Sequence, residues 1–492
     1  MKAGFMKARI VTSLLSLVVV GSVGCSLGGL STDRAAISRG DEVAQFKPIQ
    51  PEEWRLENGL RVVYLKDDEL PLVKGRLFIR GGSLWGPESP VGAVSAMGDQ
   101  MRQGGAGGRS ADVLDQELEE LAATVSSSFS TEFGGVSFSS LASDVDKVFP
   151  IFADVALRPR FEGERLALWK GQSLESIRRR KEDPSTVASI AFTQLLYGDS
   201  PYGRVSVDRD IQAISRDLLV SLHHKFVKPD GGLLVVTGRI ERPAVERLVQ
   251  ENFGGWNARG ELLPAAPAVK REPQPGIYFI ELPFSQASVQ MGHLGVPRLT
   301  PDYPAIDMFN EVFGTSGFGS RLMQRVRTEL GLTYGVYGGI SPAVVQGVNY
   351  VFLQTKADSV AAAIQESIGV LATMQAAPPT EEEMEEKRTA IQNSFVLNFD
   401  SIDEIAVRNA RLKLLEYPVD YDQTYLSKVA GVTPDLVQEV ARTRWDPKKF
   451  VIVVVGNGTA YQRLESTLAD KNSPLSSIPL RKLRFESAIV VP

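Results

Sequence analysis

The apolar positions of this chain follow two periods, one typical of strands and one typical of helices. Val136 and Phe138 alternate with polar neighbours, as in a half-buried strand. Leucines recur at helical spacing over Leu114–Leu121, shortly after Ser110, which is suited to cap a helix. Both kinds of element occur close together in the chain, which favours an α+β fold.

Further segments give the order of these elements. Arg61–Leu65 and Leu72–Arg80 are expected to be two strands paired with each other, and alternate residues of Val289–His293 share one face of a later strand. Asp183 before Pro184 is a typical helix start, because the carboxylate caps the first turn and proline fits its first position. This order predicts α/β sandwiches in which a sheet carries helices on one face.

The chain also repeats itself at a constant offset. Ser215–Leu218 and Thr433–Leu436 each open a helical stretch, which is followed by a proline and an apolar run that ends at Gly238 or Gly456. The offset is 218 residues at both ends of the repeat (433 − 215 and 456 − 238). An internal duplication into two homologous domains follows.

The domain boundaries follow from this repeat and from proline content. The stretch between the two copies is aperiodic and rich in proline, as in an extended linker. We place the first domain at residues 51–262, the linker at 263–276 and the second domain at 277–492.

The N-terminus has the pattern of an export signal. Three basic residues precede the apolar run Ile10–Val20, and small residues follow it, so residues 1–25 are expected to be a signal peptide. The run is too short to span a bilayer as a stable anchor. Residues 26–50 lack apolar periodicity and read as a flexible tether.

Cys25 stands where the small-residue cleavage site ends. This position resembles the lipobox of bacterial lipoproteins, which implies that Cys25 carries a lipid, although Ser22 stands where that motif usually has leucine. Ser26 then favours the outer membrane, facing the periplasm. The alternative is ordinary secretion with an unmodified cysteine.

Composition excludes several kinds of function. The chain has 54 lysines and arginines against 59 aspartates and glutamates, so the basic surface that nucleic acid requires is missing. One cysteine cannot form an internal disulfide. The three histidines, His223, His224 and His293, include no pair at the i, i+4 spacing that holds zinc on one helix face.

Several motifs in order resemble the insulinase/pitrilysin family of inverted-motif zinc peptidases, which includes the mitochondrial processing peptidase. They are Asn58–Val63, Arg80–Ser83, a helix start at Gly92, Gly104–Ser110 and the segment from Ser320 to Tyr334. The resemblance implies two homologous α/β-sandwich domains that close like a clam shell.

The zinc motif of that family is absent. Active members carry His-x-x-Glu-His on the first helix, and the matching positions here are Ser95, Gly98 and Asp99. The third ligand, a glutamate on a later helix, falls on Ser176, with Glu175 beside it. A serine hydroxyl is a poor zinc ligand, glycine has no side-chain donor, and one aspartate cannot replace three nitrogen and oxygen donors, so we expect this chain to bind no metal.

Two further features of the first half bear on activity. Family members present an asparagine on an edge strand to the substrate, and the corresponding stretch here is Val125–Ser127. A peptidase with a different mechanism built on Asp99 or Glu175 is disfavoured, because no nucleophile with a base beside it is visible.

The second half keeps the residues that the family uses there. The family carries an arginine and a tyrosine seven residues apart, and Arg327 and Tyr334 match that spacing. Both can donate hydrogen bonds to a substrate carbonyl and to the oxyanion formed during hydrolysis. The alternative is that Arg327, on a helix that also contains Arg321 and Arg325, is a solvated or salt-bridged surface residue, and that Tyr334 is half-buried packing.

The resemblance implies a division of labour between two homologous subunits, one with the zinc motif and one with the arginine and tyrosine. We expect this chain to be the second kind: a non-catalytic partner in a heterodimer, with zinc in the other subunit and a peptide as substrate. The alternative is a structural or peptide-binding scaffold of the bacterial envelope without a role in proteolysis.

Overall fold

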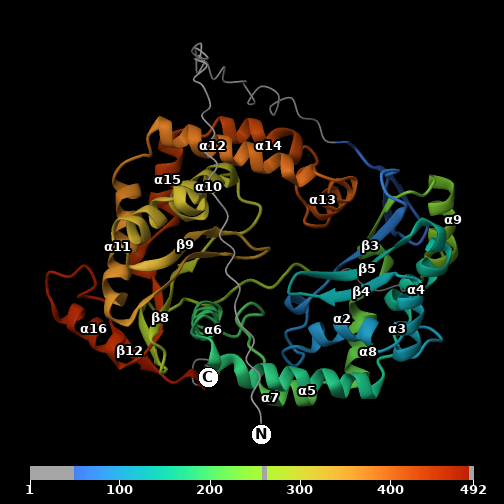
Figure 1. Cartoon of the computed structure of the whole chain (residues 1–492), viewed down its shortest axis with the longest axis horizontal. Helices are drawn as coiled ribbons and strands as arrows, with labels where there is room; N and C mark the ends of the chain where they lie inside the picture. The colour runs from blue at the N-terminus through green and yellow to red at the C-terminus, as the bar shows by residue number, and fades with distance from the viewer. Residues whose placement is uncertain (1–48, 258–262, 487–492) are drawn as a thin grey trace, which may run out of the picture.

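The computed structural model describes residues 49–257 and 263–486. It contains two six-stranded mixed sheets, one in each half of the chain. The strand orders are β1-β2-β6-β3-β5-β4 in sheet 1 and β12-β7-β11-β8-β10-β9 in sheet 2. The two halves lie side by side in Figure 1. The predicted α+β fold and the duplication are confirmed.

The first half contributes these strands: β1 (Glu52–Arg55), β2 (Arg61–Lys66), β3 (Leu72–Arg80), β4 (Thr124–Phe129), β5 (Phe133–Leu141) and β6 (Gly232–Gly238). Its helices are α2 (Ala93–Gln103), α3 (Ala111–Glu120), α4 (Val145–Leu157), α5 (Gly163–Arg179), α6 (Pro184–Tyr197), α7 (Asp208–Ala213), α8 (Arg216–Phe226) and α9 (Arg242–Phe253).

The second half contributes the strands β7 (Gly276–Glu281), β8 (Gln286–Leu294), β9 (Thr333–Ser341), β10 (Val348–Lys356), β11 (Val451–Gly456) and β12 (Leu480–Leu483). Its α-helices are α10 (Tyr303–Asn310), α11 (Val360–Ala376), α12 (Glu381–Val396), α13 (Ile402–Leu414), α14 (Tyr421–Ala430), α15 (Pro434–Arg444) and α16 (Gly458–Ala469). Two π-helices, η5 (Glu311–Thr315) and η7 (Met323–Glu329), flank a short turn, η6 (Gly317–Gly319).

The local signals read from the sequence are present. Ser110 caps α3 by accepting a hydrogen bond from the backbone NH of Val113. Asp183 caps α6 by accepting from the backbone NH groups of Ser185 and Thr186. These caps satisfy NH groups that a helix start otherwise leaves without a partner.

The expected pairing of the first two long strands is wrong. Strand β6 lies between β2 and β3, parallel to β2 and antiparallel to β3. All seven residues of β6 are buried, so this apolar strand is most stable at the centre of the sheet. The partner of β2 therefore comes from about 170 residues further along the chain, out of reach of a local pattern.

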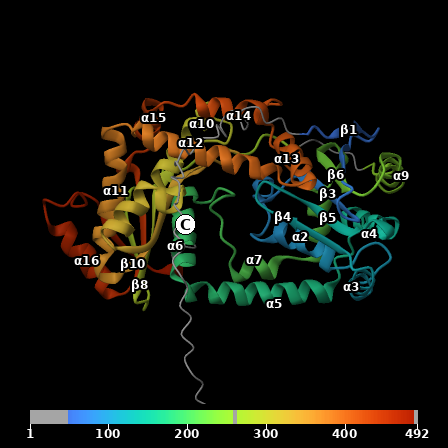
Figure 2. The same cartoon turned by 45° about the horizontal axis from the view of Figure 1, so that its top comes forward.

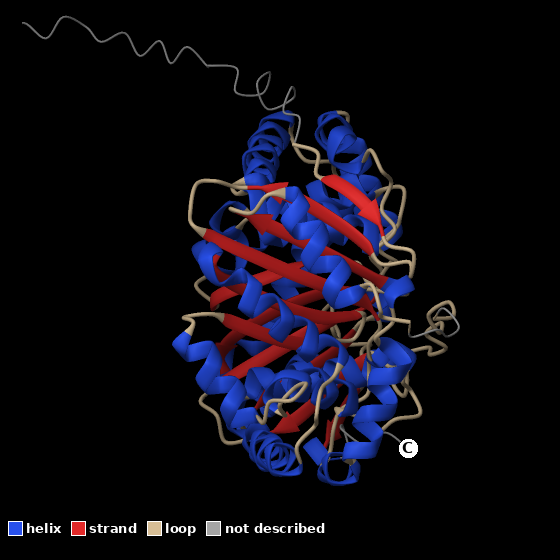
Figure 3. Ribbon diagram, turned by 90° about the vertical axis from the view of Figure 1, so that its right-hand side faces the viewer, coloured by secondary structure: helices blue, strands red, loops and turns tan. Residues whose placement is uncertain are grey.

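The helices of each half cover one face of its own sheet, as expected, but the other face is not left to solvent. Helix α6 of the first half packs on β8 and β11 of sheet 2. Its buried Val187 and Phe192 belong to the same apolar cluster as Val451, Val453 and Val455. The strands are flanked by helices in Figure 3.

Helix α13 of the second half makes the reciprocal contact with sheet 1. Its Ile405, Ala406 and Ala410 cluster with Val63 and Leu233. Figure 1 and Figure 2 show α5 and α6 leading across at one side of the molecule and α13 leading back at the other. The halves are thus interlocked by an exchange of one helix each.

The segment between the two halves contains no helix or strand over residues 263–275. It is nevertheless attached to the first half. The indole NH of Trp85 donates to the carbonyl of Pro264 at 2.9 Å, and Arg271 Nε donates to the carbonyl of Leu195 at 3.2 Å.

Candidate functional site

Helix α2 places two of the three expected zinc-motif positions on one accessible side. It begins after Gly92, whose φ of +95° lies in the left-handed region that glycine adopts at low cost. Ser95 is exposed and Asp99 is partly exposed, and they are one helical turn apart. The neighbouring Ala96 and Met97 are fully buried and set this orientation.

Gly98 lies against the backbone of β4. A Cβ atom at Gly98 would lie 2.3 Å from the backbone nitrogen of Phe129, which is shorter than any van der Waals contact. The hydroxyl of Ser127 also donates to the carbonyl of Gly98 at 2.6 Å. The helix is packed too closely on β4 for the family's glutamate, or for any side chain, at this position.

Asp99 has a partner that the sequence did not indicate. The indole NH of Trp169, on α5, donates to its carboxylate at 2.8 Å. Burial raises the pKa of Asp99, and the hydrogen bond from Trp169 opposes that shift. Asp99 is therefore engaged in packing α2 against α5, and no motif could have singled out Trp169.

Neither Ser176 nor Glu175 supplies a zinc ligand. The carboxylate of Glu175 accepts from Arg179 Nε at 2.8 Å and lies 3.7 Å from Arg178. Ser176 is exposed on the same helix, two turns beyond Trp169. Throughout residues 49–257 and 263–486, no three histidine, cysteine, aspartate or glutamate side chains gather closely enough to hold a metal ion.

The residues at this corner do not fit the zinc ion that the family fold would place there. A catalytic zinc needs three protein donors around an open position. Ser95 offers a weak hydroxyl, Gly98 offers nothing, and Asp99 is hydrogen-bonded to an indole. The adjacent strand β4 is an edge strand, as expected. Its Ser126 is hydrogen-bonded to Ser137 at 2.8 Å.

The histidines are also used for structure. His223 is buried, and its Nε2 donates to the carbonyl of Ala156 at 2.8 Å. Burial lowers the pKa of His223 to about 4, so the ring is neutral at pH 7. His293 is buried as well, accepts from the backbone NH of Asp446 and has a lowered pKa for the same reason.

The second half presents a different surface at η7 and β9, which pack against each other. Two arginines of this segment are fixed by carboxylates. Arg321 makes a two-bond pair with Glu383 at 2.9 and 2.6 Å. Arg325 donates to Glu366 at 2.8 Å and to Glu329 at 2.9 Å.

Arg327 differs from these two arginines. Its guanidinium carbon lies 4.4 Å from the centre of the Phe318 ring. Within the described part of the chain, no carboxylate comes within ion-pair distance of it. A guanidinium stacked on an exposed ring keeps its five NH donors available.

Tyr334 projects from β9 and is 84% exposed, so the half-buried packing role considered above does not apply. Strand β9 forms one edge of sheet 2. Phe318 is also largely exposed. Arg327, Tyr334 and Phe318 thus give this edge an accessible guanidinium, a phenol and an apolar ring, and sequence reasoning had missed Phe318.

The predictions for the N-terminus concern residues that the structure does not describe. The signal peptide, Cys25 and nearly all of the tether fall within residues 1–48, outside the described residues. In the described ranges, no helix is both long enough and apolar enough to cross a bilayer.

Comparison with known proteins identifies related families for both halves of the chain. A family model described as insulinase (peptidase family M16) matches residues 61–205. A second, described as the peptidase M16 inactive domain, matches residues 213–391. An uncharacterized zinc protease of Mycobacterium tuberculosis is 25% identical over 307 residues, which cover 61% of this chain and 70% of that protein.

Solved structures agree in fold. A peptidase M16 inactive domain from Pseudomonas fluorescens has a TM-score of 0.76 and 26% identity, and the match covers 83% of this chain and 98% of that one. The periplasmic protease PqqL from Escherichia coli has a TM-score of 0.70 and 16% identity over 84% of this chain and 46% of that one, a likeness of fold alone. The chain therefore belongs to the insulinase (M16) peptidase family, as a member that lacks the zinc motif.

Proposed function

We propose that this chain is the non-catalytic partner subunit of a zinc-dependent peptidase. In this role Arg327 and Tyr334 contact the peptide substrate in trans, while a homologous subunit holds the zinc ion. The proposal is supported by the contrast between the two halves. In the first half, Gly98 and Asp99 make structural contacts. The second half keeps an exposed Tyr334 on an edge strand and a partly exposed Arg327 on η7.

The single observation that carries the proposal is that Tyr334 is exposed and that the partly exposed Arg327 has no carboxylate partner among the described residues. A guanidinium without a carboxylate partner and a phenol in solvent contribute little to the free energy of folding, because both groups are also hydrated in the unfolded chain. Arg321 and Arg325 on the same segment show the usual alternative, because both are held by carboxylates.

The chemistry of these groups suits hydrolysis of a peptide bond. A guanidinium and a phenol can both donate hydrogen bonds to a substrate carbonyl, and these bonds strengthen when charge develops on its oxygen. They position and polarise the substrate but supply neither a nucleophile nor a base. The chain alone is therefore expected to be inactive.

The location is part of the proposal. The pattern around Cys25 is that of a lipid-anchored protein, and one structural neighbour is a periplasmic protease. We place the subunit at the bacterial outer membrane, facing the periplasm. Mass spectrometry of the mature N-terminal peptide should find lipid on Cys25, and an unmodified cysteine would overturn this placement.

The experiment is to co-express the chain with a homologue from the same genome that carries His-x-x-Glu-His, and to measure turnover of a fluorogenic peptide. Arg327→Ala or Tyr334→Phe should lower kcat/KM about 100-fold, the usual cost of losing one oxyanion donor. Arg325→Ala and Tyr337→Phe are matched controls on the same elements. They should leave turnover nearly unchanged.

Two results would contradict the proposal. Equal turnover in all four variants would reduce Arg327 and Tyr334 to surface residues and favour an envelope scaffold instead. Chelator-sensitive hydrolysis by the purified chain alone would show that it has a metal site of its own.

A further inference from the structure

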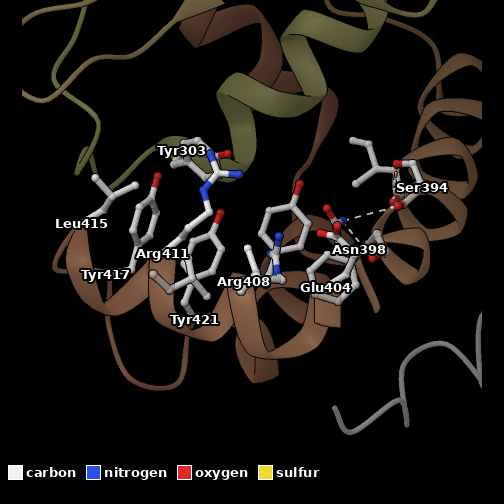
Figure 4. Close-up of a pocket in the computed structure, with 14 residues that line it drawn as sticks. Tyr303, Ser394, Asn398, Glu404, Arg408, Arg411, Leu415, Tyr417 and Tyr421 are labelled. Atoms are coloured by element: carbon white, nitrogen blue, oxygen red, sulfur yellow. Dashed lines mark hydrogen bonds between the residues drawn. The ribbon is translucent and has the colours of Figure 1, made fainter. Parts of the chain in front are cut away.

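A pocket of about 360 Å³ opens where α10, α12, α13 and α14 meet. It lies on the side of α13 that faces away from sheet 1, because Ala406 and Ala410 of that helix pack on the sheet while Arg408 and Arg411 line the pocket. None of the residues discussed for peptidase activity contributes to it. Figure 4 shows its lining.

Tyrosine rings form one wall of this pocket. Tyr417 and Tyr421 meet edge to face with ring centres 4.7 Å apart, and Tyr303 lies 6.1 Å from Tyr421. Tyr425 is 5.6 Å from Tyr421 and stacks on Phe395 at 5.1 Å. Such a wall offers large apolar surfaces that lose little conformational entropy when a ligand binds.

A carboxyl group behind the wall holds these rings in place. The hydroxyl of Tyr425 donates to Asp307 at 2.7 Å. Burial raises the pKa of Asp307 to about 6, while the Tyr425 and Tyr303 hydroxyls act in the opposite direction. The tyrosines are therefore oriented before any ligand arrives.

One of the two arginines in the pocket is already neutralised. Arg408 donates to Asp422 at 2.9 and 2.7 Å, and its guanidinium lies 5.3 Å from the ring centres of both Phe395 and Phe399. This arginine acts as a structural part of the pocket floor.

Two other charges of the pocket have no such partner. Among the described residues, neither Arg411 nor Glu404 has an oppositely charged group within ion-pair distance. Both are exposed and lie on α13, seven residues apart, so they share a helix face with about 10.5 Å of axial separation. In Figure 4, Arg411 reaches toward Tyr303 at one end and Glu404 lies beside Asn398 at the other.

The spacing of these opposite charges defines a ligand. We propose that the pocket binds a short zwitterionic peptide of about three residues, with its terminal carboxylate on Arg411, its terminal ammonium on Glu404 and a central apolar side chain on the tyrosine wall. An extended chain advances about 3.3–3.6 Å per residue, so three residues match the axial separation of about 10.5 Å between Glu404 and Arg411. Arginine suits a carboxylate because its planar fork donates two parallel bonds.

Charged residues on the helix that covers the sheet are found on α13 but not on its counterpart in the first half, α6. Helix α6 plays the same part in the exchange of helices, yet it contains no charged residue over its whole length. Covering a sheet thus does not require charges on the outer face. The site does not depend on the proposed partner subunit, since every residue belongs to this chain.

The test is isothermal titration of the full chain with the tripeptide Ala-Phe-Ala, its N-acetyl form and its C-terminal amide. Each blocked form should bind about 10-fold more weakly or worse, because each loses a hydrogen bond between charged groups. Arg411→Gln should weaken binding of the free tripeptide as much as amidation does. Amidation should then cause no further loss in this variant. Likewise, Glu404→Gln should weaken binding of the free tripeptide as much as acetylation does. Acetylation should then cause no further loss of affinity in this variant.

Lys428→Gln, an exposed change on α14, is the control and should bind like the unaltered chain. Both tested side chains are exposed, and melting temperatures will show that the variants fold. No binding of the free tripeptide at millimolar concentration would overturn the proposal. Binding of both blocked forms as tightly as the free tripeptide would also overturn it. Binding lost on amidation but not on acetylation would show a simple carboxylate site and would likewise refute the zwitterion.

Discussion

The two halves share the order of five of their six strands and treat the same kind of surface in opposite ways. In the first half, the corner at α2 is closed by Gly98 packed on β4 and by Asp99 bound to Trp169. In the second half, η7 and β9 leave Arg327 and Tyr334 available to solvent.

At the positions expected to match the zinc motif, the packing of α2 against its neighbours matters as well as the identity of the side chains. Once glutamate is absent from position 98, α2 can approach β4 to a distance that no larger residue tolerates. Once histidine is absent from position 99, the carboxylate there can hydrogen-bond α5. Restoring the motif would therefore require moving a helix as well as changing three side chains.

The largest effect that tests this comparison concerns a histidine of the first half. Since burial lowers the pKa of His223 to about 4 while the unfolded chain has a value near 6.5, the unfolded state binds the proton more readily. The stability due to the neutral ring is complete above pH 6.5 and is lost as pH falls toward 4, by about 3 kcal/mol.

Urea unfolding of His223→Asn at pH 7 and pH 4 checks this expectation, because the variant should lack that part of the pH dependence. His224→Asn, an exposed neighbour on α8, is the control and should keep it. If both variants follow the unaltered chain, His223 is not the buried neutral group described here.

A smaller effect is expected at the closed corner itself. Gly98→Ala should lower the free energy of unfolding by about 1–3 kcal/mol, the usual cost of overpacking, because its Cβ meets the backbone of β4. Gly171→Ala on α5, where no atom lies within 4 Å, should stabilise the chain by up to about 1 kcal/mol. Equal effects of the two changes in urea unfolding would show that α2 can move away from β4.

The smallest effect is expected for the contact between Phe318 and Arg327, and its measurement as peptide turnover depends on the proposed function. Phe318→Ala removes the ring beneath Arg327, an exposed contact that contributes about 0.5–1 kcal/mol. Turnover by the complex with the zinc-bearing partner should fall about two- to fivefold. Leu436→Ala, a half-exposed apolar change on α15, should have no effect. A loss as large as that of Arg327→Ala would mean that Phe318 itself contacts the peptide.

Local patterns were sufficient to predict much of the fold. The caps at Ser110 and Asp183 depend on neighbours within a few residues, and the strands that end at Gly238 and Gly456 are continuous apolar runs. All of them are present. The place of β6 between β2 and β3 was not predictable in this way. It depends on contacts between segments far apart in the chain.

In the candidate site as well, residues of one helix were predictable from the sequence, whereas their partners on other elements were not. The motif spacing identified Ser95, Gly98 and Asp99, because they lie on one helix. The partners of these residues come from other elements. Trp169 reaches Asp99 from α5, and Phe318 reaches Arg327 from a separate turn, so neither contact leaves a periodic signal in the sequence.

The exchange of α6 and α13 has a consequence for the origin of the molecule. A single half on its own would expose an apolar sheet face that includes Val63 and Leu233, which are buried only because α13 covers them. Two copies of such a half could cover each other by trading this helix about a twofold axis. The present chain has the architecture expected of that homodimer after gene fusion, which would have freed each half to diverge separately.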